Sequence, residues 1–294
     1  MNIIIAINNS YVEPAMTMIY SLWYNNKTIN IDVYLMYSDL NASNISKINS
    51  FIKKLDLMKI HLVYVEDCVF SDAPISKWWS KEMYYRIIAF DLLPKNVNKA
   101  LWLDADIIIN GNIYDFYNLN IDAYFAAVCK GCNQSGVKRL HLTSKKYFNS
   151  GVILFNFNRI RASYKTSDFF ACILKYNNVL ITPDQDVLNI MFDDNVYYVD
   201  EKKYNNETFG DFVLTKEKMT FLMNDALVIH FNGPTKPWNP KGINWADKIW
   251  WKYELMRGKK KEFIYYRLLN FPAKFRARLK EFQWLILAIL KKKG

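Results

Sequence analysis

The sequence predicts an α/β fold in which helices cover both faces of an open, mainly parallel sheet. Apolar, strand-like segments alternate with helix-like segments through residues 1–103, as expected of repeated β-α-β units. Residues 2–7 are mainly apolar instead of alternately polar, which is typical of a strand buried on both faces. A chain of 294 residues is long enough for one large domain of this class or two small ones.

Residues that favour turns and helix ends delimit the predicted elements. Pro14 fits the first turn of a helix, Asn41 and Ser43 are candidate caps of a second, and Pro94 follows the end of a third. The predicted strands are residues 2–7, 31–36, 60–65, 100–103 and 151–156, with a short one from residue 228. The predicted helices are residues 13–24, 43–55 and 80–92, with a further one that opens at residue 183.

The most informative segment is residues 100–109, where Asp104 and Asp106 interrupt an apolar run. In an extended chain, residues i and i+2 project to the same side, so the two carboxylates could face one point. Buried, ionised carboxylates are costly without a cation, and a divalent metal is one candidate. A helix cap or pairing with Lys and Arg is the alternative. The pair follows the carboxyl end of a predicted strand, where open α/β sheets bind ligands, and this favours a functional role.

Positive charge is concentrated at the C-terminal end of the chain. Residues 259–294 hold eleven Lys and Arg against two acidic residues, a net charge of +9, which leaves +2 of the total +11 for the first 258 residues. The body of the chain therefore lacks the character of a general polyanion binder, and we expect no nucleic-acid partner. We divide the chain after residue 258.

The segment 259–294 predicts a basic amphipathic helical tail that lies on an anionic membrane surface. Its uninterrupted apolar run, residues 284–290, is far shorter than the roughly 20 residues needed to span a bilayer. Phe275, Leu279, Phe282 and Ile286 have helical spacing and would form the apolar face. Docking of this helix on the protein's own core is the alternative.

Cysteine content and the N-terminus predict a cytoplasmic protein. The four cysteines form no disulfide framework, and Cys129 and Cys132 make a lone C-x-x-C, which is a weak metal or redox signal by itself. The first six residues lack a basic region and a signal-peptide core, and they are predicted to form a strand.

Six segments, in this order, closely resemble the retaining glycosyltransferases of family 8. They are IIAINNSY (4–11), YR (85–86), LDAD (103–106), FNSGV (148–152), DQDVLN (184–189) and HFNGPTKPW (230–238). The resemblance extends over residues 1 to about 245, and the six segments together are far more specific than a DxD motif alone. It implies a GT-A fold, a single Rossmann-like domain with a mixed sheet, here assigned to residues 1–258.

The resemblance also implies a metal site and a UDP-hexose donor. In this family both acids of the DxD motif and a distant histidine bind Mn²⁺, which here are Asp104, Asp106 and His230. An imidazole among carboxylates agrees with a transition metal, although Mg²⁺ is also possible. Gly233 and Lys236 match the positions that hold the diphosphate.

Further matches give the nucleotide and donor-sugar residues. Asn8 lies where relatives carry an Asp that pairs with uracil, a departure that still offers a carbonyl acceptor. Ser10 and Tyr11 match positions beside uracil and ribose, and Arg86 matches an Arg near the donor sugar and phosphate. The donor-binding set also includes Ala105 and Asn149.

Asp184 and Gln185 match the positions that approach the anomeric carbon, and we assign them to catalysis. A double displacement needs a nucleophilic carboxylate, whereas an amide such as that of Gln185 is a poor nucleophile. We therefore favour front-face attack, in which the departing phosphate accepts the acceptor's proton and Gln185 supports the oxocarbenium-like charge.

The resulting hypothesis is a Mn²⁺-dependent transferase that moves galactose or glucose to a glycan acceptor. Lipopolysaccharide or another lipid-linked saccharide is the expected acceptor, and the inner face of a bacterial plasma membrane is the expected location. Two alternatives remain open: a catalytically silent UDP-sugar or glycan-binding module, and a glycogenin-like enzyme that glucosylates protein.

Overall fold

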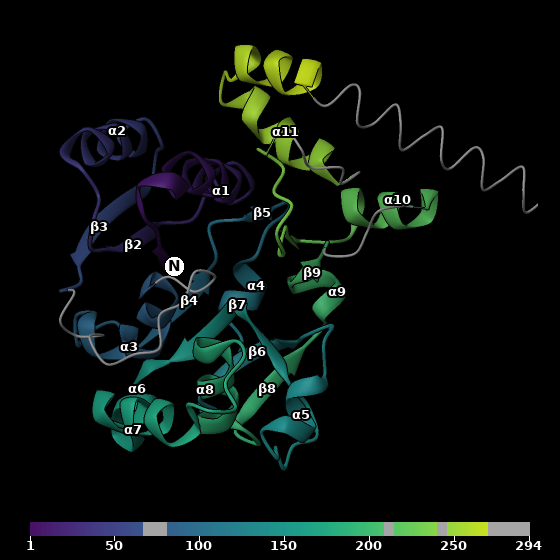
Figure 1. Cartoon of the computed structure of the whole chain (residues 1–294). Helices are drawn as coiled ribbons and strands as arrows, with labels where there is room; N and C mark the ends of the chain where they lie inside the picture. Colours follow the sequence, from purple (N-terminus) through teal and green to yellow (C-terminus); the bar gives the residue numbers. More distant parts are fainter. Residues whose placement is uncertain (67–80, 209–214, 240–245, 270–294) are drawn as a thin grey trace, which may run out of the picture. The chain divides into compact units, whose positions relative to one another are not determined.

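The computed structural model describes residues 1–66, 81–208, 215–239 and 246–269 (Figure 1). These residues form two compact units. The first comprises residues 1–207 and 225–230, and the second comprises the described residues of 208–224 and those from 231 onward. The large sheet and the DxD motif belong to the first unit.

The core of the first unit is a seven-stranded sheet in the order β3-β2-β1-β4-β7-β6-β8. The strands are β1 (Asn2–Ala6), β2 (Ile31–Tyr37), β3 (Met58–Tyr64), β4 (Lys99–Leu103), β6 (Ala126–Lys130), β7 (Phe148–Asn156) and β8 (Val196–Val199). Strand β7 runs antiparallel to both neighbours, β4 and β6, whereas the other pairs are parallel. The predicted mixed, mainly parallel sheet is confirmed.

Alternate residues of each strand enter two separate cores, one on each face of the sheet. On β4, Ala100 and Trp102 pack with one set of helices, whereas Leu101 and Leu103 pack with another. The first face is covered by α3 (Tyr85–Leu92), α6 (Phe157–Ser163), α7 (Thr166–Tyr176) and α8 (Pro183–Phe192). The second is covered by α1 (Val12–Asn25), α2 (Ala42–Ile52) and α4 (Tyr114–Tyr117). Helices cover both faces, as predicted (Figure 1).

Several predicted boundaries differ from the structure. The helix expected over residues 43–55 ends at Ile52, because a turn with Leu57 at φ +60° leads into β3. The helix expected over 80–92 opens as a 3₁₀ helix, η3 (Lys81–Tyr84), before α3. The strand expected from residue 151 begins at Phe148. Asn41 caps α2 as predicted, since its side chain accepts a hydrogen bond from Asn44 N.

A second, three-stranded sheet in the first unit was not predicted. It consists of β5 (Ile107–Ile109), β10 (Val228–His230) and β9 (Asn206–Glu207), in the order β5-β10-β9. Strand β10 pairs antiparallel with β5 and parallel with β9. The short helices η1 (Asn9–Tyr11), α5 (Ser135–Arg139) and α9 (Glu201–Tyr204) complete the first unit.

The second unit contains α10 (Lys216–Asn224), α11 (Asp247–Met256) and a helical segment, residues 260–269. That segment packs on α11: Tyr266 donates a hydrogen bond to Asp247 at 2.7 Å, and its ring lies 4.5 Å from that of Trp251. The start of the predicted tail is therefore docked within its own unit. The residues that define the predicted apolar face, from Phe275 onward, lie outside the described residues. Among the described residues, no helix is both long and apolar enough to cross a membrane.

Candidate functional site

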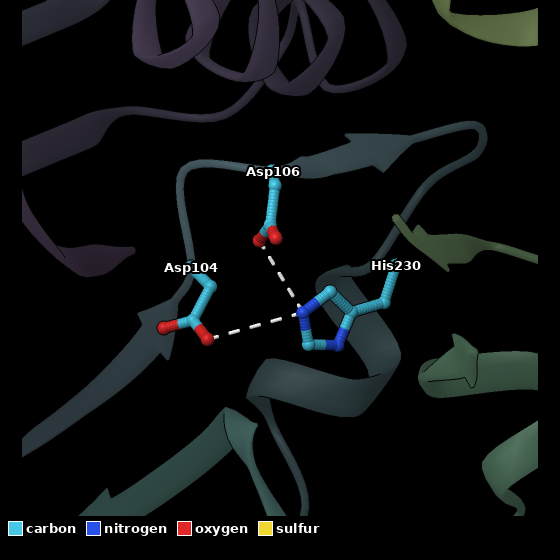
Figure 2. Close-up of side chains that lie close together, drawn as sticks. All are labelled: Asp104, Asp106 and His230. Carbon is cyan, nitrogen blue, oxygen red and sulfur yellow. Dashed lines mark ion pairs between the residues drawn. The ribbon is translucent and has the colours of Figure 1, made fainter. Parts of the chain in front are cut away.

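The DxD motif lies in a turn between two strands. Strand β4 ends at Leu103, and Asp104, Ala105 and Asp106 lead directly into β5. The expectation that an extended backbone aligns the two carboxylates is wrong, because the chain turns at this point. The carboxylates still converge, and Figure 2 shows both directed toward one histidine ring.

That histidine is His230, the last residue of β10. The register of the small sheet places His230 opposite Ile107, the residue that follows the DxD motif. Its Nε2 atom lies 3.3 Å from Asp106 Oδ1 and 3.9 Å from Asp104 Oδ2 (Figure 2). One ligand atom from each of the three residues can be chosen so that all lie within 4.8 Å of one another. The structure therefore brings together three residues separated by up to 126 positions, the predicted metal set.

The carboxylates around His230 favour a positive charge in this cluster. Burial alone would lower the pKa of His230, but the carboxylates of Asp106, Asp104 and Glu207 outweigh it and raise the pKa. His230 is 3% exposed and Asp106 is 8% exposed. A divalent cation would supply the balancing charge while leaving the imidazole neutral.

The surroundings also fit a metal ion. Gly151 lies against the cluster, and a Cβ atom at this position would be 2.3 Å from His230 Cε1 and 2.9 Å from Asp104 Oδ2. A larger residue would thus push these two ligands away. Two carboxylates and one imidazole form a donor set that suits Mn²⁺.

Asp104 has a distinct partner for each of its two oxygens. Oδ1 accepts hydrogen bonds from Trp102 Nε1 at 2.8 Å and Arg86 Nη2 at 3.0 Å. Oδ2 is the oxygen nearer to His230. The carboxylate is therefore oriented by two fixed donors, and Oδ2 is the oxygen directed to the cluster. The alternative considered for the acidic pair, a contact with Arg, is thus found at Asp104, beside the candidate metal cluster.

Arg86, which is 6% exposed, connects the DxD motif with α8. Besides Asp104, its guanidinium pairs with Asp184 Oδ2 at 3.0 Å and donates to the carbonyl oxygen and hydroxyl of Ser150 at 2.6 and 2.8 Å. Its N–H groups are largely used by the protein. The structure thus shows Arg86 as an organiser of the site, and its predicted contact with the donor stays a prediction.

Asp184 and Gln185 lie in the first turn of α8. Asp184 is 1% exposed, and this burial raises its pKa despite the nearby Arg86; the charge of Asp104 raises it further. Its Oδ1 atom has no hydrogen-bond partner among the described residues. Gln185 Oε1 accepts a hydrogen bond from Ser150 N at 2.9 Å, which fixes the orientation of the amide. Ser150, which the sequence alone did not single out, therefore joins Arg86, Asp184 and Gln185.

The predicted nucleotide residues lie at the end of β1. Asn8 precedes η1, and its side-chain oxygen accepts hydrogen bonds from both the amide and the hydroxyl of Ser10, at 3.1 and 2.6 Å. Pairing of this carbonyl with uracil would compete with Ser10. Tyr11 is half-buried at the end of the same turn. Their predicted role in nucleotide binding stays a prediction.

Gly233 and Lys236 belong to the second unit. Gly233 has φ +90°, a left-handed conformation that favours glycine, and Lys236 Nζ donates to Phe231 O at 2.9 Å.

Asn149, in the first unit, accepts hydrogen bonds through Oδ1 from Gly151 N and Asn205 Nδ2. Cys129 and Cys132 are both free, the former buried and the latter exposed.

Besides Ser150, sequence analysis did not single out two other residues that contact the candidate site. Trp102 was interpreted as core alone, although its indole N–H holds Asp104. Asn205 lies outside all six family-like segments, yet its side chain contacts His230. A tryptophan two residues before the DxD motif was a usable signal, whereas nothing local marks Asn205.

The chain is similar in sequence to known bacterial glycosyltransferases. The chain is 26% identical over 251 residues to lipopolysaccharide 1,2-glucosyltransferase of Escherichia coli K12, covering 83% of this chain and 74% of that protein. It is 32% identical over 192 residues to lipopolysaccharide 1,3-galactosyltransferase of Salmonella typhimurium, covering 62% and 56%.

The fold matches that of the galactosyltransferase LgtC, solved with donor and acceptor sugar analogs. The TM-score is 0.73 at 17% identity, and the match covers 86% of this chain and 95% of LgtC, which establishes the expected GT-A fold. The sequence pattern of Glycosyl transferase family 8 matches residues 2–242. This chain belongs to glycosyl transferase family 8.

Proposed function

We propose that the protein is a retaining hexosyltransferase that uses Mn²⁺ and a UDP-hexose donor. The convergence of Asp104, Asp106 and His230 carries this proposal, because a buried cluster of two carboxylates and one imidazole is poorly balanced without a cation. Galactose and glucose are the proposed donor sugars, in keeping with the two relatives compared above.

The metal would be held by Asp104, Asp106 and His230, and when bound it would neutralise the diphosphate of the UDP leaving group. Arg86 and Trp102 hold Oδ1 of the Asp104 carboxylate, which leaves Oδ2 to bind the ion when it is present. We assign Gly233 and Lys236 to the diphosphate, and Asn8, Ser10 and Tyr11 to the nucleoside. Ala105 lies between the two acids, where its backbone would line the donor site.

At the reaction centre, Asp184 and Gln185 would bind the donor hexose. The unpartnered Oδ1 of Asp184 would accept a hydrogen bond from a sugar hydroxyl, which relieves the cost of a buried, unsatisfied oxygen. Because Asp184 is fully buried and paired with Arg86, it is poorly suited to attack the anomeric carbon. These features support front-face attack, with Gln185 stabilising positive charge on the sugar.

We further propose a lipid-linked glycan, such as lipopolysaccharide, as acceptor, because both relatives compared above are named for activity on lipopolysaccharide. A peripheral position on the inner face of the plasma membrane follows from this acceptor. Residues 260–269 support it, since Ile264, Tyr265, Leu268 and Leu269 are exposed on a segment that also carries Lys260, Lys261 and Arg267.

Release of UDP tests the enzymatic proposal. Purified protein should release UDP from UDP-galactose or UDP-glucose when Mn²⁺ is present, and EDTA should abolish the release. A catalytically silent binding module would bind the nucleotide sugar without releasing UDP. A glycogenin-like enzyme would increase its own intact mass in steps of one hexose.

Truncation tests the membrane proposal. Deletion of residues 270–294 leaves the contact between Tyr266 and Asp247 in place, whereas deletion from residue 259 would remove it. The shorter deletion should preserve UDP release and weaken sedimentation with anionic vesicles, and sedimentation of the full chain should fall as the salt concentration rises. Equal sedimentation of the full and truncated chains at all salt concentrations would reject a role for the tail.

A further inference from the structure

Asn205 lies on the side of His230 opposite the DxD motif and bonds to its other ring nitrogen. His230 Nδ1 is 2.9 Å from Asn205 Oδ1, and Asn205 is 1% exposed. Asn205 follows α9 and precedes β9, the strand that pairs with β10. The small sheet therefore holds the asparagine and the histidine in fixed register.

The backbone amide of Gly151 determines which group donates in the hydrogen bond between Asn205 and His230. Gly151 N, which can only donate, lies 2.8 Å from Asn149 Oδ1. Asn149 Oδ1 also accepts a hydrogen bond from Asn205 Nδ2 at 3.0 Å. With its amide nitrogen directed to Asn149, Asn205 must present its oxygen to His230. That oxygen can only accept, so His230 Nδ1 must carry a proton.

We infer that Asn205 is a positioning residue for metal binding, because it holds the proton of His230 on Nδ1 and leaves Nε2 to bind the ion. This inference rests on the metal site proposed above. A neutral histidine has one protonated ring nitrogen, and the hydrogen bond at one nitrogen determines which atom is free to act as a ligand. We call the chain of hydrogen bonds from the Gly151 amide through Asn149 and Asn205 to the imidazole the relay.

The relay also links the metal site to the predicted donor-sugar pocket. Asn149 is one of the residues expected to hold the donor sugar, yet its carbonyl oxygen already accepts two N–H groups. Asn149 would thus offer the sugar its amide nitrogen, as a donor to a hydroxyl oxygen. The Asn149 side chain would therefore contact the donor sugar and also hold Asn205, which positions the metal ligand His230.

The first test measures Mn²⁺ binding without any nucleotide sugar, by calorimetry. Asn205→Leu, which keeps the approximate size but removes the acceptor, should weaken Mn²⁺ binding by about 10- to 100-fold. Asn205→Asp, which keeps an acceptor for Nδ1–H but loses the hydrogen bond to Asn149, should bind Mn²⁺ more tightly than Asn205→Leu. Asn156→Ala is the matched control, since Asn156 is a buried asparagine whose side chain, among the described residues, bonds only to Ile121, Tyr124 and Arg159. Unchanged affinity in Asn205→Leu, or equal losses in all three variants, would overturn the inference.

The second test reads the proton directly by ¹⁵N NMR of labelled histidine, with diamagnetic Mg²⁺ in place of Mn²⁺. The chain has three histidines, so a His230→Gln spectrum identifies the signal. A protonated Nδ1 is expected in the wild type, and His230 protonated on Nε2 alone would overturn the relay. If the wild type bound no Mn²⁺, the proposed function would fail, while the NMR result would still decide the relay.

Discussion

Asp184 and Asp186 are two residues apart in the first turn of α8, and both are buried, but their surroundings differ completely. Asp186 accepts two hydrogen bonds from Arg139, one from Tyr147 and one from Ile181 N. Burial would raise its pKa, but these donors outweigh it and lower the pKa. Asp184 pairs with Arg86 through one oxygen only, and its pKa is raised.

The difference separates a structural carboxylate from one that we propose is functional. Every oxygen of Asp186 is satisfied by the protein, so a ligand would gain little by approaching it. Asp184 keeps one oxygen without a hydrogen-bond partner among the described residues, and folding disfavours its charge. It is connected through Arg86 to Asp104 and the candidate metal cluster. Perturbed, incompletely satisfied groups of this kind are typical of functional sites.

The largest expected effect is the loss of folding stability when Asp186 is replaced. Asp186→Asn should lower the free energy of unfolding by about 3 to 5 kcal/mol, because it breaks a buried ion pair and leaves Arg139 uncompensated. The kcat for UDP release should stay near that of the wild type. Urea unfolding midpoints and steady-state kinetics on the same preparations check this. Unchanged stability with lost activity would reverse the assignment.

Replacement of Asp184 should instead reduce activity much more than stability. Asp184→Asn should reduce kcat/KM by about 10- to 100-fold, since a hydrogen bond between a charged group and a sugar hydroxyl is worth about 1.5 to 3 kcal/mol. Because folding disfavours the ionised form of Asp184, the variant should lose far less stability than Asp186→Asn. The same two assays compare the variants directly, and equal losses of stability would break the contrast.

A substitution of Gln185 tests whether this residue acts at the anomeric carbon of the donor sugar. Gln185→Ala should lower kcat about tenfold and change the KM for the donor much less, as expected for contacts that strengthen in the transition state. Initial rates over a range of donor concentrations separate the two constants. A change in KM alone would make Gln185 a binding residue.

The smallest expected effect is the acid dependence of the Asp186 contribution. A carboxylate with a lowered folded-state pKa stabilises the protein fully above its ordinary value of 3.8, and this contribution is lost as the pH falls through the folded-state pKa. The stability difference between wild type and Asp186→Asn should therefore be constant from about pH 7 to pH 5 and shrink below about pH 4. Urea titrations at several pH values measure it, and a constant difference down to the most acidic pH would contradict the prediction.

Local sequence patterns predicted much of the sheet but could not distinguish these two acids. The central strands β1 and β4 are largely apolar, which burial on both faces explains. Two partners of Asp186, Arg139 and Tyr147, lie 47 and 39 residues earlier in the chain, so spacing within α8 does not reveal them. The antiparallel direction of β7 likewise depends on the path of the chain and not on its apolar sequence.

The candidate site shows the same limit. The acidic pair was predicted from its apolar surroundings, although the geometry that aligns it is a turn and not an extended strand. His230 was assigned through family resemblance, because a lone histidine carries no local signal. Asn205 belongs to the site only because β9 pairs with β10, and that pairing was not predicted.

Metal-dependent UDP release by wild type and Asp106→Asn tests the central claim most directly. Asp106→Asn removes a charge from the metal cluster while preserving shape, so the protein should stay folded. We expect UDP release from UDP-hexose with Mn²⁺ in the wild type, none with EDTA, and a loss on the order of a hundredfold or more in the variant. Release by the wild type that is unaffected by EDTA, or near-wild-type release by Asp106→Asn at low Mn²⁺, would contradict the account.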